Sequence, residues 1–251
     1  MENKLTKYNG NFVKCSKKIA KAGEIIATAR EGMIERIARR KTSRYESKGC
    51  WHSEGTANID GVTYWCLAEY APTTQNIKRT YAANFEGLYL PLISNVKIRV
   101  ESALELIPRI AAEDKNKLPE QRRVLIPEMQ DTFIIDSAEF GNIDIARFLA
   151  RDATLAKDYS HLLDIFYGTK FTSFYQLAVD ENSAAGVFLG VVGDVSHFTV
   201  YGTDGDFSDS NGRMFGTTAK SQVIGLEKKA IKPTPKQLAI IEQLLMNRPK
   251  K

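Results

Sequence analysis

Carboxylates in the last third of the chain come nearest to a catalytic arrangement. Asp204, Asp206 and Asp209 lie together in a polar run, and Glu227 and Lys229 follow a predicted strand further along. Carboxylates from a loop and a strand end could hold Mg²⁺, and a lysine beside them could steady a phosphate. The same loop is also typical of a polar turn whose side chains hydrogen-bond their own backbone, which is the interpretation we favour. A metal-dependent nuclease or phosphoryl-transfer enzyme therefore stays an alternative.

A second group of metal-ligating types is weaker. Cys50, His52 and Cys66 supply soft ligands, but no Cys-x-x-Cys pair and no obvious fourth ligand accompany them. We expect no metal here, and no cofactor other than Mg²⁺ under the nuclease alternative. The three cysteines of the chain are an odd, sparse set, which indicates free thiols and a reducing, cytoplasmic location. No apolar run is long enough to cross a membrane, so we expect no membrane partner.

The charge distribution carries more information than the net charge of +5. Residues 1–48 carry a net +8, residues 220–251 a net +6, and the part between them a net −9. Basic ends of this size indicate an anionic partner, most often nucleic acid. The alternative is a basic helix that docks on the acidic middle of its own molecule. We divide the chain into a basic arm and helix (1–44), a core (45–219) and a basic strand and helix (220–251), the last of these as part of the core domain.

Candidate nucleic-acid contacts combine basic and aromatic residues. Exposed aromatic rings stack on bases while basic side chains follow the backbone, which is the chemistry of single-strand binding. The alternative is that the aromatics fill the core, since strands favour them. The basic candidates are Lys17, Lys18, Lys21, Arg36, Arg39, Arg40, Lys41, Arg44, Lys78 and Arg79, and the aromatic candidates are Trp51, Tyr81 and Phe85.

The elements that must position these residues follow from apolar periodicity. Residues 187–192 and 195–201 predict a buried hairpin at the centre of the core, and Asp60-Gly61 predicts a second hairpin turn. One apolar stripe predicts a single amphipathic helix from Ser16 to about residue 40, and another predicts a helix over 144–167. Pro108 is expected to kink or end a helix that begins near residue 101. We predict an exposed loop over 114–123, a strand over 222–226 and a helix over 234–246.

Strands and helices alternate irregularly, which predicts an α+β fold. We expect a mixed, mainly antiparallel sheet covered by two or three helices, with a basic amphipathic N-terminal helix. The leading functional hypothesis is a non-catalytic nucleic-acid-binding protein that favours single-stranded DNA or RNA. The nuclease is one alternative. The other is an assembly protein, a homo-oligomer that self-associates through its basic N-terminal helix.

Overall fold

The apolar run at the centre of the sequence forms two neighbouring strands. β11 (Ser183–Gly190) and β12 (His197–Gly202) pair antiparallel, with Val187 opposite Gly202 and Leu189 opposite Val200. The side chains of Val187, Leu189 and Val200 are almost fully buried. The predicted antiparallel pairing of the two central strands is confirmed, and the turn predicted between them lies outside the described residues.

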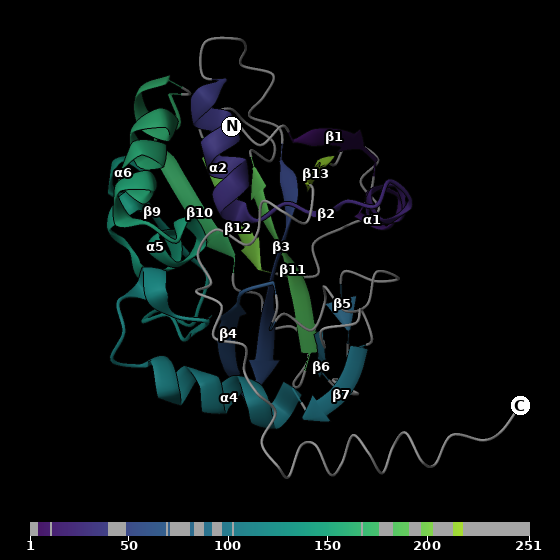
Figure 1. Cartoon of the computed structure of the whole chain (residues 1–251). Helices are drawn as coiled ribbons and strands as arrows, with labels where there is room; N and C mark the ends of the chain where they lie inside the picture. The colour runs from purple at the N-terminus through teal and green to yellow at the C-terminus, as the bar shows by residue number, and fades with distance from the viewer. Residues whose placement is uncertain are drawn as a thin grey trace, which may run out of the picture.

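The computed structural model places these strands in the middle of an eleven-stranded sheet (Figure 1). It describes residues 5–10, 12–39, 49–68, 70, 81–82, 88–91, 97–101, 103–166, 168–175, 183–190, 197–202 and 213–217. The main path of the sheet runs β1-β13-β3-β11-β12-β10-β9. The other strands on this path are β1 (Thr6–Asn9), β13 (Arg213–Thr217), β3 (Cys50–Ile59), β10 (Phe171–Tyr175) and β9 (Phe133–Asp136).

Shorter strands extend the sheet. They are β2 (Ile25–Ile26) on β13, β4 (Val62–Cys66) on β3, β5 (Tyr81–Ala82) on β11 and β8 (Val124–Leu125) on β4. A separate two-stranded sheet joins β6 (Leu88–Pro91) to β7 (Lys97–Glu101). The β10–β12 and β13–β3 pairs are parallel and the remaining pairs are antiparallel. The predicted α+β class with a mixed, mainly antiparallel sheet is confirmed.

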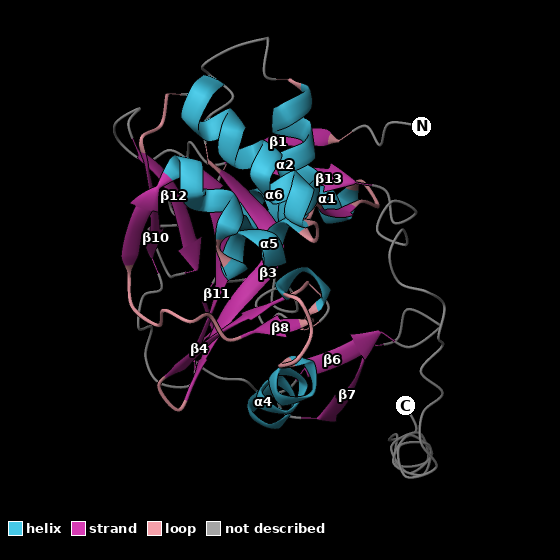
Figure 2. Cartoon of the chain, turned by 90° about the vertical axis from the view of Figure 1, so that its left-hand side faces the viewer, coloured by secondary structure: helices cyan, strands magenta, loops and turns pink. Residues whose placement is uncertain are grey.

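Helices lie on both faces of the sheet. One face is covered by α2 (Ala29–Ala38), α5 (Asp144–Ala150) and α6 (Ala153–His161), with a 3₁₀ helix, η3 (Ser137–Asn142), and a π-helical turn, η4 (Leu162–Phe166), beside them (Figures 1 and 2). The opposite face receives α1 (Phe12–Lys21) next to β1 and β13. At the other end of the molecule, α4 (Ala103–Asp114) packs beside β8, and the 3₁₀ helix η2 (Pro119–Gln121) follows it.

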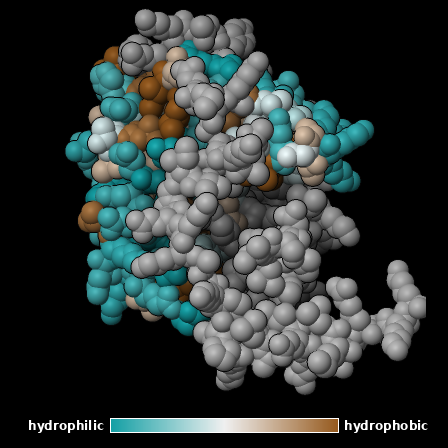
Figure 3. All heavy atoms as spheres, in the orientation of Figure 1, coloured by the Kyte–Doolittle hydropathy of each residue, from teal (hydrophilic) through white to brown (hydrophobic). Residues whose placement is uncertain are grey.

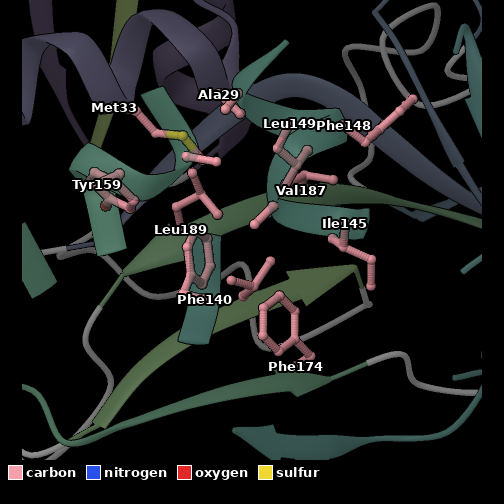
Figure 4. Close-up of a cluster of buried hydrophobic side chains, with 14 of the residues drawn as sticks. Ala29, Met33, Phe140, Ile145, Phe148, Leu149, Tyr159, Phe174, Val187 and Leu189 are labelled. Carbon is pink, nitrogen blue, oxygen red and sulfur yellow. The ribbon is translucent and has the colours of Figure 1, made fainter. Parts of the chain in front are cut away.

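The main core fills the space between the sheet and α2, α5 and α6 (Figure 4). Phe174 from β10 stacks on Phe133 with ring centroids 4.7 Å apart and on Phe140 with centroids 5.7 Å apart. Tyr159 of α6 meets Phe140 edge-on. Offset and edge-on ring pairs of this kind add to the free energy gained from burial alone. A smaller cluster on the opposite face holds α1 in place.

The single N-terminal helix predicted over 16–40 is wrong, because the chain forms two helices there. Gly23 has a left-handed φ of +71° and ends α1 in a Schellman motif, in which the Glu24 amide donates to the Ile19 carbonyl. A capping box then begins α2: the Glu31 amide donates to Thr28 Oγ1, and the Thr28 amide donates to the Glu31 carboxylate at 2.8 Å. The basic amphipathic helix that the sequence predicts is therefore α1 alone.

The predicted helix over 144–167 is also interrupted. Arg151 adopts a left-handed φ of 56°, and the carboxylate of Asp152 caps α6 by accepting from the amides of Thr154 and Leu155. Pro108 does not end the helix that contains it, since α4 continues through Pro108 to Asp114.

The Asp60-Gly61 turn is confirmed as a two-residue hairpin loop between β3 and β4. Both residues have positive φ, 50° for Asp60 and 76° for Gly61, which is what a type I′ turn requires. The predicted strand over 222–226 and helix over 234–246 lie outside the described residues. Within the described part of the chain, every helix is too short or too polar to cross a bilayer.

Candidate functional site

The candidate site is a depression between α2 and the edge of the sheet that β1, β13 and β3 form. Alternate residues of a strand share a face, and paired residues of neighbouring strands do too. Lys7 pairs with Phe215 and Arg213 pairs with Cys50, so all four side chains lie on the face that α2 covers. The depression spans about 310 Å³, including open solvent. We call it the basic pocket, and its lining residues are Lys7, Glu35, Arg36, Arg39, Cys50, Arg213 and Phe215.

The four cations of the basic pocket are held in different ways. Arg36 is only 4% exposed, and its guanidinium donates to the Tyr159 hydroxyl and, at 2.9 Å, to the Leu189 carbonyl. Arg39 forms an ion pair with Glu35 one turn earlier on α2. Lys7 and Arg213 form no hydrogen bond or ion pair through their side chains with any residue that the structure describes. The pocket therefore has a formal charge of +3, four cations and one carboxylate.

A second basic surface lies on α1. Cys15 and Ile19 are buried against Trp51 and Met214, and this fixes which side of the helix faces outward. The exposed side carries four lysines, and Figure 3 shows a mainly hydrophilic surface over this part of the molecule. We call it the lysine face of α1, and it consists of Lys14, Lys17, Lys18 and Lys21. A row of exposed lysines with a buried opposite side is suited to contact an extended anion.

Two residues predicted to contact nucleic acid lie in the interior. Trp51 is 7% exposed and packs under α1, so its ring has no free face for a base. Arg36 points inward because it falls on the side of α2 that contains Met33, which is fully buried in the main core. Both are corrections to the predicted surface, although Arg36 still lines the basic pocket from below.

The remaining predicted residues divide into exposed and undescribed ones. Lys17, Lys18, Lys21 and Arg39 are exposed. The backbone of Tyr81 lies in β5, and nothing is described of its side chain. Outside the described residues lie the basic candidates Arg40, Lys41, Arg44, Lys78 and Arg79, the aromatic Phe85, and the nuclease candidates Asp204, Asp206, Asp209, Glu227 and Lys229.

The soft-ligand group does not assemble. Cys50 packs with Leu5, Ala27 and Phe215, whereas Cys66 is buried in the separate cluster beneath α4, where burial raises its thiol pKa. Among the described residues, no three His, Cys, Asp or Glu side chains are placed to hold a metal ion.

His52 is a buried group that the sequence did not single out for a structural role. It is 2% exposed and lies against Gly32 of α2, where a Cβ would sit 2.3 Å from the His52 ring. Neither ring nitrogen has a hydrogen-bond partner in the described part of the structure. Burial, followed by the positive charge of Arg36, lowers the pKa of His52 to about 3, so the ring is neutral at pH 7.

Sequence reasoning missed Lys7, Glu35 and Arg213 as site residues. Lys7 and Arg213 are 206 positions apart and reach one pocket only because β1 pairs with β13. No local sequence motif predicts that β1 pairs with β13. A usable signal did exist for α2, because Thr28 and Glu31 have the spacing of a capping box and would have separated the two N-terminal helices.

Comparisons with known proteins bear on the fold. No protein-family model matches the sequence, and the search of curated proteins found no match. A solved structure described as "Accommodation of massive sequence variation in Nanoarchaeota by the C-type lectin fold" superposes with a TM-score of 0.56. The match covers 86% of this chain and 98% of that one, at 13% sequence identity. This chain therefore shares the C-type lectin fold.

Proposed function

We propose that this protein is a non-catalytic nucleic-acid-binding protein that favours single-stranded DNA or RNA. The observation that carries the proposal is the convergence of Lys7, Arg36, Arg39 and Arg213 around one pocket that contains a single carboxylate. Cations that neutralise phosphates release condensed counterions, which supplies most of the affinity of sequence-independent binding.

The lysine face of α1 supports the same proposal. Its exposed lysines project from a helix that is fixed in place by burial of Cys15 and Ile19. Lysine on a fixed helix acts as a mobile point charge that can follow a backbone of variable conformation. With Trp51 buried, base stacking rests on Tyr81 and Phe85 alone, so the proposal places more of the affinity in phosphate contacts than the sequence suggested.

The similarity to the C-type lectin fold supports a binding role in general terms. The neighbouring structure is described as a case in which this fold accommodates massive sequence variation. A scaffold that tolerates substitution can carry unrelated binding surfaces, so the surface of this chain determines its ligand.

The experiment is a titration of the full chain with a fluorescent single-stranded oligonucleotide, followed by anisotropy at increasing NaCl. The logarithm of the affinity should fall linearly with the logarithm of the salt concentration. The triple variant K17Q/K18Q/K21Q should reduce the slope by about 2 to 3, since each lost phosphate contact removes about 0.7 to 0.9.

A matched variant controls for net charge. K115Q/K157Q/K170Q removes the same three charges from exposed lysines outside α1 and the basic pocket, and it should leave the slope unchanged. An affinity that does not respond to salt, or equal slopes for the two triple variants, would contradict the proposal. Mg²⁺ or Mn²⁺ added to the same samples tests the nuclease alternative by cleavage. Light scattering at rising protein concentration without nucleic acid tests self-association.

A cytoplasmic location is part of the same proposal. Cys15, Cys50 and Cys66 are all buried free thiols, a pattern that a reducing compartment maintains. Fractionation of the native host with thiol labelling of the denatured protein tests it, and oxidised cysteines in the recovered chain would count against it.

A further inference from the structure

The basic pocket differs from the lysine face of α1 in shape. The lysines of α1 are spread along a convex helix, whereas the cations of the pocket come from β1, β13 and α2 and surround one concave space. Convergent cations can contact a single compact anion from several sides. Spread cations contact successive charges of an extended one.

The floor of the basic pocket is buried and mainly apolar. Phe215 is 9% exposed and Cys50 is 2% exposed, and both pack with Leu5 and Ala27. Arg36 is held from below by the Tyr159 hydroxyl and the Leu189 carbonyl, so its charge is fixed before any ligand arrives. A fixed charge next to an apolar floor interacts more strongly with an anion than the same charge does in bulk water.

The rim supplies mobile donors. Lys7 is exposed and Arg213 is half-buried, and neither side chain is engaged by a residue that the structure describes. Glu35, the one carboxylate in the lining, is paired with Arg39. The pocket thus offers an ammonium and a guanidinium fork to an incoming oxyanion, with a net lining charge of +3.

These features select among phosphate species. A phosphodiester carries a single negative charge, whereas a phosphomonoester carries about −1.5 to −2 at pH 7 and offers three terminal oxygens. The basic pocket is small and partly open to solvent, so it suits a compact anion better than a larger ligand. We infer that the basic pocket binds the dianionic phosphate group of a phosphomonoester. This inference rests on the proposed function in one respect: the polymer that would carry the phosphomonoester at its end is a nucleic acid.

The first experiment uses inorganic phosphate on the full chain, by isothermal titration calorimetry at pH 7.5 and constant ionic strength in NaCl. Binding with one phosphate per chain is expected. R213Q and K7Q should each weaken it by about tenfold, which is the usual effect of losing one charge-assisted hydrogen bond. K115Q/K157Q alters two exposed lysines outside both basic surfaces and should bind as the unchanged chain does. K7Q alters an exposed side chain, so its result stands even if R213Q unfolds. No binding of phosphate, or equal loss in K115Q/K157Q, would overturn the inference.

The second experiment uses the charge of the ligand. Phosphoserine with blocked amino and carboxyl groups is a phosphomonoester that loses its second phosphate charge as the pH falls through about 6, whereas sulfate stays a dianion. Between pH 7.5 and pH 5.5, the affinity for blocked phosphoserine should therefore fall about threefold to fivefold relative to that for sulfate, as the dianion fraction falls. Equal changes for both anions would mean that the pocket does not select the dianion, and would overturn the assignment.

Two oligonucleotides separate this inference from the proposed function. They have the same sequence and carry either a 5′-phosphate or a 5′-hydroxyl. Tighter binding of the phosphorylated strand, removed by R213Q, is expected. If inorganic phosphate binds as described but neither strand binds, the pocket assignment stands and the nucleic-acid proposal falls. If both strands bind equally and free phosphate does not bind, the pocket assignment falls and the proposed function stands.

Discussion

Two groups of charged residues in this molecule differ in how their charges are balanced. At the end of α4, Arg109, Glu113, Asp114, Lys117 and Arg123 form a closed group, which we call the α4 ion cluster, in which each acid contacts a base. In the basic pocket, four cations surround one carboxylate. In the α4 ion cluster the charges pair with one another, whereas the basic pocket keeps a surplus of positive charge that a ligand can neutralise.

The α4 ion cluster is built around a buried carboxylate. Asp114 is 0% exposed and accepts hydrogen bonds from the Arg123 amide at 2.7 Å, from Arg123 Nε at 3.0 Å and from Arg123 Nη2 at 2.9 Å. Lys117 Nζ lies 2.7 Å from Asp114 Oδ1, the oxygen that also accepts from Arg123 Nη2. Although burial opposes ionisation, the hydrogen bonds from Arg123 and Lys117 lower the pKa of Asp114 to about 2. The predicted exposed loop over 114–123 is largely confirmed, since most of its residues are exposed or partly exposed, whereas Asp114 at its start is buried and holds Arg123 at its end.

Charge density alone does not separate structural charges from binding charges. The α4 ion cluster comes from one stretch of the chain, whereas the basic pocket is assembled from distant stretches. Their roles differ because a buried acid fixes one group and strand pairing leaves the other with surplus cations.

The largest effect is expected from D114A. It removes a buried acceptor and leaves Arg123 and Lys117 without their central partner, so the free energy of unfolding should fall by about 3 kcal/mol. Chemical denaturation followed by fluorescence measures this, and phosphate binding should be unchanged. E113Q, which alters a half-exposed partner of Arg123, should cost less than about 1 kcal/mol. Equal effects of the two variants would contradict the central role of Asp114.

A smaller loss of stability is expected from R36M. Methionine fills a similar volume but leaves the Tyr159 hydroxyl and the Leu189 carbonyl without this donor, at a cost of about 2 kcal/mol. Unlike D114A, this variant should also lose phosphate binding. If R36M keeps its phosphate affinity, Arg36 is not part of the binding site and has a structural role only.

The pH dependence of stability should report His52. Its folded pKa of about 3 lies below the usual 6.5, so the unfolded chain binds a proton that the folded chain does not. Stability is therefore complete above pH 6.5 and falls as the pH drops toward 3, by about 1.4 kcal/mol between pH 7.5 and pH 5.5. Asp114 adds to the pH dependence of stability only below about pH 4, where its stabilising contribution is lost as the pH falls toward its folded pKa of about 2. H52Q carries no titrating group, and a slope in that pH range as steep as that of the unchanged chain would contradict the assignment.

The smallest change in stability is expected from K7Q. An exposed lysine with no described partner contributes little to folding, so the free energy of unfolding should move by less than about 0.5 kcal/mol. Its phosphate affinity should nevertheless fall. Denaturation and calorimetry on the same sample test both statements, and a K7Q protein that is clearly destabilised would place Lys7 among the structural charges.

Sequence reasoning reached the parts of the fold that local patterns determine. The antiparallel pairing of the two central strands, the Asp60-Gly61 turn and the α+β class depend on alternation and turn chemistry, and the structure confirms them. The ends of the helices were missed at Gly23 and Asp152, where a short capping motif overrides a continuous apolar stripe. The basic pocket could not be predicted, because the strand pairing that joins Lys7 to Arg213 spans almost the whole chain.

The most direct test of the difference between structural and ligand-binding charges compares the phosphate-induced stabilisation of D114A with that of R213Q, both measured by thermal unfolding. At a phosphate concentration ten times the dissociation constant, a bound anion should raise the free energy of unfolding by about 1.4 kcal/mol. D114A should unfold at a lower temperature but keep this gain. R213Q should unfold close to the unchanged chain and lose it. Equal phosphate-induced gains in both variants would contradict the assignment of the surplus cations to ligand binding.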